Sequence, residues 1–140
     1  MLLKSALVCL ALNVYYEARN QSIEGQMAVT YTVLNRVKDS RFPNDICKVV
    51  YQGKHSKITG MPLRNKCHFS WYCDGRTDAP KDLDAYRWAE MVVRHVWINK
   101  HSDITEGSTH YHSINVNPNW AKNKTFLGQI GDHLFYRWEK

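Results

Sequence analysis

The sequence lacks the features that mark several common classes of protein. It has no hydrophobic run long enough to cross a membrane. It has no segment dense enough in lysine and arginine to form a nucleic-acid-binding arm, and no zinc-finger or RNA-binding signature. It also has no repeats, linkers or low-complexity segments. We therefore expect a single domain over residues 1–140, with no membrane span and no nucleic-acid partner.

Positive charge and aromatic side chains are what the sequence does have. Lysine and arginine outnumber aspartate and glutamate by 19 to 13, which gives a net charge of +6 at pH 7. Such a charge attracts polyanions, including anionic glycans. The 5 Trp, 8 Tyr and 4 Phe supply core volume, and aromatic rings also stack on sugars. Neither feature alone identifies a function.

Helical spacing of apolar residues predicts a mainly helical chain. The stripes over residues 3–19, 22–37 and 82–99 are typical of amphipathic helices, and a short helix is expected from Asn44 or Asp45. The first residues, MLLKSALVCLAL, resemble a signal peptide. Because their apolar face continues towards residue 18, we interpret them instead as the first helix of a catalytic domain that starts here or was trimmed to here.

The rest of the chain predicts loops and short strands. Residues 52–66 hold two glycines and a proline and are expected to form a loop. Residues 67–75, CHFSWYCDG, look extended, and residues 108–118 and 126–138 have the alternation typical of small strands. The predicted fold class is therefore α+β, mainly α, with a small β region.

The four cysteines fall into two groups. Cys9 and Cys47 lie in helical patterns, where buried free thiols are expected. Cys67 and Cys73 could close a short hairpin by a disulfide, which would indicate an oxidising compartment such as a periplasm or cell wall. A zinc site that combines them with His68 would not have the spacing of a common zinc motif.

Glu17 is the residue with the clearest chemical signal. It follows Tyr15 and Tyr16 at the end of the first predicted helix, where partial burial would raise the pKa of its carboxyl group. A carboxyl group that stays protonated near neutral pH can act as a general acid. The alternative is a solvated glutamate, or one paired with Arg19, and for an isolated glutamate this alternative is the more common.

Four ordered blocks of sequence carry a resemblance to a known family. They are ALNVYYEARNQSIEGQMAVTYTVLNRV, FPNDICKVVYQ, CHFSWYCDG and THYHSINVNPNWA with the later IGDHLFY. In this order they resemble the SleB-type cell-wall hydrolases, which include spore-cortex-lytic enzymes and related phage lysis proteins. The resemblance covers nearly the whole chain, and the first block is the most specific.

The resemblance implies a lysozyme-like, mainly α fold and a lytic transglycosylase that acts on peptidoglycan glycan strands without a cofactor. It also implies that Glu17 is the catalytic acid.

Family members commonly have Gly-Glu after the E-A-R motif, whereas this chain has Asn20 and Gln21, so a second carboxylate is absent there. A transglycosylase can work with one carboxylate, acting first as acid and then as base. If a second exists, Glu24 is the leading candidate, although its position also suits a charge at a helix N-terminus.

The other candidate site residues are expected to line the cleft around Glu17. Ser70 could form a hydrogen bond to substrate and Trp71 could stack on a sugar, although Trp71 could equally be a core residue. Tyr111 and His112 could bond to substrate or to Glu17. His110 and His112 would lie on one face of a strand, but without a third ligand we expect no metal site. Two further aromatic residues are expected to serve packing and a polar contact near a turn: Trp120 and His133.

The predicted enzyme cleaves the β-1,4 bond between N-acetylmuramic acid and N-acetylglucosamine. It is expected to be a monomer that acts in the bacterial cell wall or periplasm, and the absence of a separate export signal or wall-binding domain favours a phage lysis protein. Three alternatives remain open: a hydrolytic muramidase, a non-catalytic peptidoglycan-binding module, and an amidase. The amidase would be zinc-dependent and would use some of four histidines: His68, His110, His112 and His133.

Overall fold

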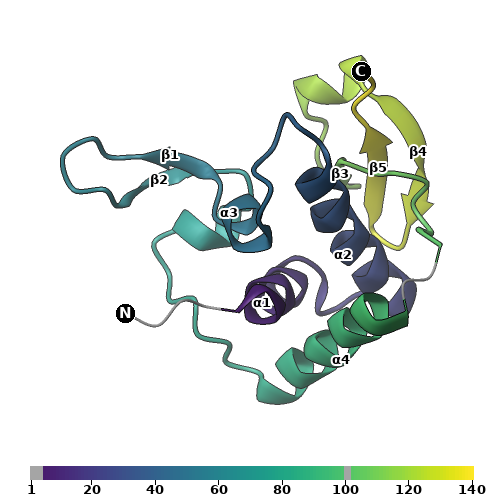
Figure 1. Cartoon of the computed structure of the whole chain (residues 1–140), viewed down its shortest axis with the longest axis horizontal. Coiled ribbons are helices and arrows are strands. Elements are labelled where there is room, and N and C mark those ends of the chain that lie inside the picture. Colours follow the sequence, from purple (N-terminus) through teal and green to yellow (C-terminus); the bar gives the residue numbers. More distant parts are fainter. Residues whose placement is uncertain (1–4, 100–101) are drawn as a thin grey trace.

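The computed structural model describes residues 5–99 and 102–140 and shows a helical body with a small sheet on one side (Figure 1). Helix α1 (Ala6–Ala18) lies at the centre and packs against α2 (Ile23–Lys38), α3 (Ile46–Val50) and α4 (Leu83–Asn99). Because neighbours surround α1, its residues are buried from Cys9 to Tyr15. This burial explains why the first residues are apolar enough to resemble a signal peptide.

The helices begin where polar side chains can cap them. The hydroxyl groups of Ser5 and Ser22 accept hydrogen bonds from the first turns of α1 and α2, and the carboxylate of Asp45 does the same for α3. All four predicted helices are confirmed within the described residues, and residues 3 and 4, with which the first predicted helix begins, lie outside them. Helix α1 ends at Ala18, and the chain turns sharply before α2 begins at Ile23.

Three antiparallel strands form the sheet beside α2, in the order β3-β5-β4. They are β3 (His110–Ser113), β4 (Thr125–Ile130) and β5 (His133–Arg137), with a 3-10 helix at Asn119–Asn123 before β4. The predicted small strands are thus confirmed. The mainly helical α+β class is confirmed as well.

Hydrogen bonds attach the sheet to α2 through the segment that leads into β3. Arg36 Nε donates to the carbonyl oxygen of Thr109 at 2.7 Å, and Asn35 Nδ2 donates to the carbonyl oxygen of Ser108 at 2.9 Å. Thr32 Oγ1 donates to Ser108 Oγ at 3.1 Å. These bonds fix the position of β3 relative to the helical body.

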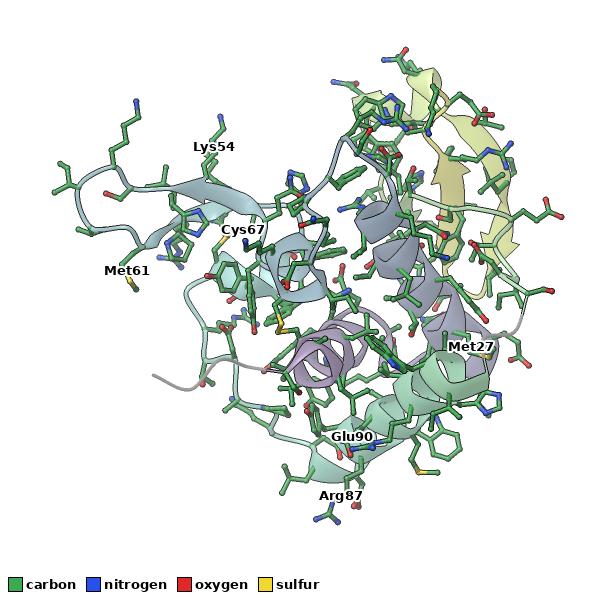
Figure 2. The ribbon with its side chains drawn as sticks, viewed as in Figure 1. Met27, Lys54, Met61, Cys67, Arg87 and Glu90 are labelled. Carbon is green, nitrogen blue, oxygen red and sulfur yellow. A yellow bond between two sulfur atoms is a disulfide. The ribbon has the colours of Figure 1, made fainter. Side chains whose placement is uncertain are left out.

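The prediction of a loop over residues 52–66 is wrong in part. Strands β1 (Gly53–His55) and β2 (Pro62–Cys67) pair as an antiparallel hairpin that extends away from the helical body, with Cys67 at its base and Met61 towards its outer end (Figure 2). Gly60, with φ at 75°, forms the turn that the sequence suggested. The strands were missed because most of their side chains are exposed, so no alternation of apolar and polar residues marks them.

The prediction that residues 67–75 are extended is wrong beyond Cys67, the last residue of β2, because Ser70–Cys73 forms a 3-10 helix that buries Trp71 and Cys73. The predicted Cys67–Cys73 disulfide is confirmed. The prediction of free thiols at Cys9 and Cys47 is wrong, because packing of α3 on α1 brings their Cα atoms to within 5.3 Å of each other and a disulfide joins them.

Within the described residues, no helix is long and apolar enough to cross a membrane.

Candidate active site

Glu17 lies in the last turn of α1, at the wall of a cleft of about 390 Å³. One wall comes from the end of α1 and the turn before α2, and the other comes from the end of β3 and the turn between β4 and β5. The lining side chains are mostly polar, so they offer hydrogen-bond donors and acceptors to a polar ligand. They are Tyr16, Glu17, Arg19, Asn20, Gln21, Ser113, Asn115, Asp132 and His133.

A short hydrogen bond joins Glu17 to the sheet. The hydroxyl group of Tyr111, in β3, donates to Glu17 Oε1 at 2.7 Å. Burial raises the pKa of Glu17 above its usual 4.5, and the Tyr111 hydrogen bond and the charge of Arg36 offset part of this effect. The protonated form is therefore more favoured than in an exposed glutamate, which is the direction that a general acid requires. Arg19 forms no ion pair with Glu17 among the described residues, and its guanidinium group lies over the ring of Tyr15 at 4.8 Å.

Arg36 is a buried cation close to Glu17 that sequence reasoning missed. It is only 7% exposed, and its guanidinium carbon lies 5.1 Å from the ring centre of Phe69 and 4.9 Å from that of Phe42. Burial lowers the pKa of Arg36 to about 10, so the side chain remains charged at neutral pH. Its charge stabilises the ionised form of Glu17. The sequence does hold a signal, since Arg36 interrupts the apolar stripe of the helix predicted over residues 22–37.

Trp71 lies behind the cleft wall rather than at its surface. It is 5% exposed, and its indole N–H donates to Asn13 Oδ1 at 2.9 Å. Its ring stacks on Tyr16, with 4.9 Å between the ring centres, and Tyr16 is the aromatic residue that lines the cleft. Ser70 is exposed and does not belong to the lining.

Strand alternation separates Tyr111 from His112. His112 is buried on the opposite face of β3, where Nδ1 donates to the carbonyl oxygen of Ser113 and Nε2 accepts from the hydroxyl group of Tyr136. His110 and His112 share this face, as predicted, and both rings pack on Trp120. The structure therefore brings Tyr111 to Glu17, whereas His112 packs against Trp120 and Tyr136 on the other face of the sheet.

His133 enters the cleft from the start of β5. Its ring centre lies 5.2 Å from that of Tyr111, and its Nδ1 atom is buried without a hydrogen-bond partner in the part of the chain that is described. Burial lowers the pKa of His133, so the neutral ring is favoured. Glu24, by contrast, is exposed in the first turn of α2 and does not line the cleft.

Gln21 and Asp132 connect the two walls of the cleft. Gln21 Nε2 donates to Asp132 Oδ2 at 3.0 Å, and the backbone N–H of Asp132 donates to Gln21 Oε1 at 3.0 Å. Sequence reasoning noted Gln21 only as a departure from the family pattern and treated Gly131-Asp132 only as a turn. The cleft thus contains a second carboxylate, which comes from a segment far from Glu17 in the sequence.

The described residues, 5–99 and 102–140, contain no group of three or more His, Cys, Asp or Glu side chains that could hold a metal ion. The histidines of the zinc-amidase alternative are divided by the sheet. His110 and His112 lie on one face of β3, and His133 lines the cleft, where its ring contacts that of Tyr111.

The raised pKa of Glu17 predicts a pH-dependent effect of Glu17→Gln on stability. The unfolded glutamate loses its proton near pH 4.5 and the folded one at higher pH, so this group stabilises the wild type below pH 4.5 and loses that contribution as pH rises through the folded pKa. Glutamine does not titrate. The free energy of unfolding of the variant minus that of the wild type should therefore increase above pH 4.5, as measured by urea unfolding at several pH values. A difference that decreases with pH would mean that the pKa of Glu17 is lowered.

Comparison with known sequences gives one family match and one close curated relative. The sequence profile of the family described as Cell Wall Hydrolase matches residues 20–136, a stretch that includes Tyr111, Asp132 and His133 and begins just after Glu17. Over 127 residues, 90% of this chain, the sequence is 42% identical to the spore cortex-lytic enzyme of Bacillus subtilis (strain 168). The chain spans about a third of that relative, since the match covers 35% of its length.

Two solved structures share the fold. The catalytic domain of the Bacillus cereus SleB protein superimposes with a TM-score of 0.66 at 22% identity, over 94% of this chain and 89% of that one. The catalytic domain of the germination-specific lytic transglycosylase SleB from Bacillus anthracis gives a TM-score of 0.64 at 20% identity, over 96% of this chain and 97% of that one. Both matches confirm the mainly helical fold with small antiparallel sheets.

Proposed function

The chain belongs to the cell wall hydrolase family, and from this premise we propose that it is a lytic transglycosylase that cleaves peptidoglycan glycan strands. The proposed bond is the β-1,4 linkage between N-acetylmuramic acid and N-acetylglucosamine. The observation that carries this proposal is the environment of Glu17, a carboxyl group at a polar cleft whose pKa is raised by burial and which accepts a hydrogen bond from Tyr111. This environment suits a group that must first donate a proton and then accept one.

In the first step, Glu17 donates its proton to the glycosidic oxygen. The bond between that oxygen and C1 of the muramic acid breaks, and N-acetylglucosamine leaves with a free 4-hydroxyl group. The resulting Glu17 carboxylate is stabilised by the Tyr111 hydrogen bond and by the charge of Arg36. These two groups lower the cost of the ionised state, while burial keeps the protonated state available for the next cycle.

In the second step, the 6-hydroxyl group of the same muramic acid attacks C1. Its proton passes to the Glu17 carboxylate, and the oxygen closes a 1,6-anhydro ring. No water is consumed, and Glu17 ends the cycle protonated, as it began. One residue can therefore supply both the acid and the base, which agrees with the presence of Gln21 where relatives commonly have glutamate.

The cleft lining indicates how the substrate would be held. Tyr16 is supported from behind by Trp71 and offers an aromatic face for a sugar ring. Arg19 is exposed at the cleft and carries a positive charge suited to a carboxylate of the stem peptide. Ser70, Trp71, His112 and Glu24 lie outside the lining, so we propose Tyr16 and Arg19 as the first contacts to test.

We propose spore-cortex or cell-wall peptidoglycan as the substrate, because the curated relative is named a spore cortex-lytic enzyme and one structural neighbour a germination-specific lytic transglycosylase. These matches come from Bacillus species and give no support to the expectation of a phage lysis protein. The net charge of +6 would concentrate the protein on an anionic wall.

Mass spectrometry of the soluble products tests the proposal. Purified protein incubated with peptidoglycan should release muropeptides that end in 1,6-anhydro-muramic acid. Muropeptides with reducing ends would instead indicate a hydrolytic muramidase, and free stem peptides with intact glycan would indicate an amidase. Binding to insoluble peptidoglycan without any soluble product would overturn the assignment of an enzyme.

A further inference from the structure

We propose that Asp132 is the second functional carboxylate of the cleft and that it stabilises the positive charge that develops on the sugar ring as the glycosidic bond breaks. This inference rests on the proposed function and extends it, since the transition state of glycoside cleavage resembles an oxocarbenium ion. A fixed anion beside such a charge lowers the barrier most when it is oriented before the reaction begins.

Asp132 lies in the same cleft as Glu17, but on the opposite wall. Glu17 comes from the last turn of α1, and Asp132 comes from the turn between β4 and β5. A sugar ring bound between the two walls would therefore lie between the proton donor and a second carboxylate.

The side chain of Asp132 is oriented without being neutralised. Gln21 donates to Oδ2 at 3.0 Å, and a carboxamide carries no charge that could cancel that of the carboxylate. Among the described residues, Asp132 forms no ion pair, and its Oδ1 atom accepts no hydrogen bond. One oxygen is therefore fixed by the protein, and the other is available to the ligand.

The pairing of Gln21 with the turn is closely fitted. The backbone N–H of Asp132 donates to Gln21 Oε1, so the two residues exchange hydrogen bonds. Gly131 has φ at 58°, and a Cβ atom at this position would collide with Gln21 Oε1. Gln21 is itself held at its backbone, because its N–H donates to the carbonyl oxygen of Ala18 and its carbonyl oxygen accepts from Gln26 Nε2.

A purely structural clamp between the two walls would show the same hydrogen bonds, so the experiment must separate charge from hydrogen bonding. Asp132→Asn does this, because the asparagine oxygen can still accept from Gln21 Nε2 while the negative charge is lost. The double variant Gln21→Glu with Asp132→Asn exchanges the two groups and returns a carboxylate to the same pair from the other wall. Asp84→Asn, at an exposed position in the first turn of α4, is the matched control.

The first readout is the turnover rate on peptidoglycan. We expect Asp132→Asn to lower kcat by about 10²-fold, comparable to the loss of one preorganised electrostatic contact, with little change in KM. The exchanged double variant should recover to within about tenfold of the wild type. Full activity of Asp132→Asn, or equal loss in both variants, would overturn the proposal and leave Gln21 and Asp132 as a structural clamp.

The second readout does not require turnover. An iminosugar of the N-acetylglucosamine type carries a positive charge at neutral pH and imitates the charge that develops on the closely related N-acetylmuramic acid ring, and N,N′,N″-triacetylchitotriose is a neutral reference. Titration calorimetry gives the affinity of each protein for the two ligands. The wild type and Asp84→Asn should bind the iminosugar more tightly than the neutral reference. In Asp132→Asn the ratio of the two affinities should fall by at least about tenfold, and in the exchanged double variant it should recover. Absence of the preference in the wild type would overturn the role of Asp132, whereas the products alone decide between transglycosylase, muramidase and amidase.

Discussion

Glu17→Gln is expected to lower the release of soluble muropeptides by about 10³-fold or more. Positioned general acids and bases each contribute on the order of 10²- to 10⁴-fold, and in the proposed cycle Glu17 performs both roles. Glutamine has nearly the same shape, and its oxygen can still accept the hydrogen bond of Tyr111. The loss should therefore come from the missing proton, and muropeptide release followed by chromatography measures it.

The matched control for this variant is Glu90→Gln. Glu90 lies on α4, where it faces Arg94 at 3.8 Å on the protein surface (Figure 2), and the same chemical change there should leave activity within about twofold of the wild type. If Glu17→Gln remains folded and retains full activity, Glu17 is not the acid. Asp132 would then be the carboxyl group of the cleft to test as the proton donor.

Removal of the Cys9–Cys47 disulfide is expected to give the largest loss of stability. The two cysteines are 38 residues apart, and the chain-entropy relation assigns such a cross-link about 4 kcal/mol. The Cys67–Cys73 bridge, with a separation of 6, is assigned about 2 kcal/mol. Cys9 is also fully buried in the core, so its reduction would leave two thiols in tight packing.

Two double variants allow this comparison, Cys9→Ala with Cys47→Ala and Cys67→Ala with Cys73→Ala. Urea unfolding at one pH, with and without a reducing agent, should place the first double variant below the second in free energy of unfolding. The reducing agent should destabilise the wild type. It should have little effect on a variant in which all four cysteines are replaced by alanine, because that variant has no disulfide to reduce. The opposite order of the two double variants would show that packing at the second bridge outweighs loop closure.

Local sequence patterns were sufficient to predict the helices and to place Glu17 at the end of α1, because both depend on nearby residues. The stripe of α2 and its cap at Ser22 lie within one segment, and the position of Glu17 at the end of α1 follows from the break at Asn20. The hairpin at β1 and β2 was missed for a physical reason, since its side chains are exposed and follow no burial pattern.

The remainder of the site depends on contacts between distant segments. Asp132 lies 111 residues after Gln21, and Tyr111 lies 94 residues after Glu17, so no local pattern predicts either pairing. The Cys9–Cys47 bridge was missed in the same way, because it follows from the packing of α3 on α1. Arg36 is different, since a charged residue within an apolar stripe was visible in the sequence and can now be recognised as the cation beside Glu17.

The attachment of β3 to α2 affects when during synthesis the cleft can form. Glu17 is made early, but Tyr111, Asp132 and His133 come from the last third of the chain. The bonds from Thr32, Asn35 and Arg36 to residues 108 and 109 position that late segment. A nascent chain that still lacks β4 and β5 thus holds Glu17 in an incomplete cleft. The cleft is complete only after the chain has been made as far as His133.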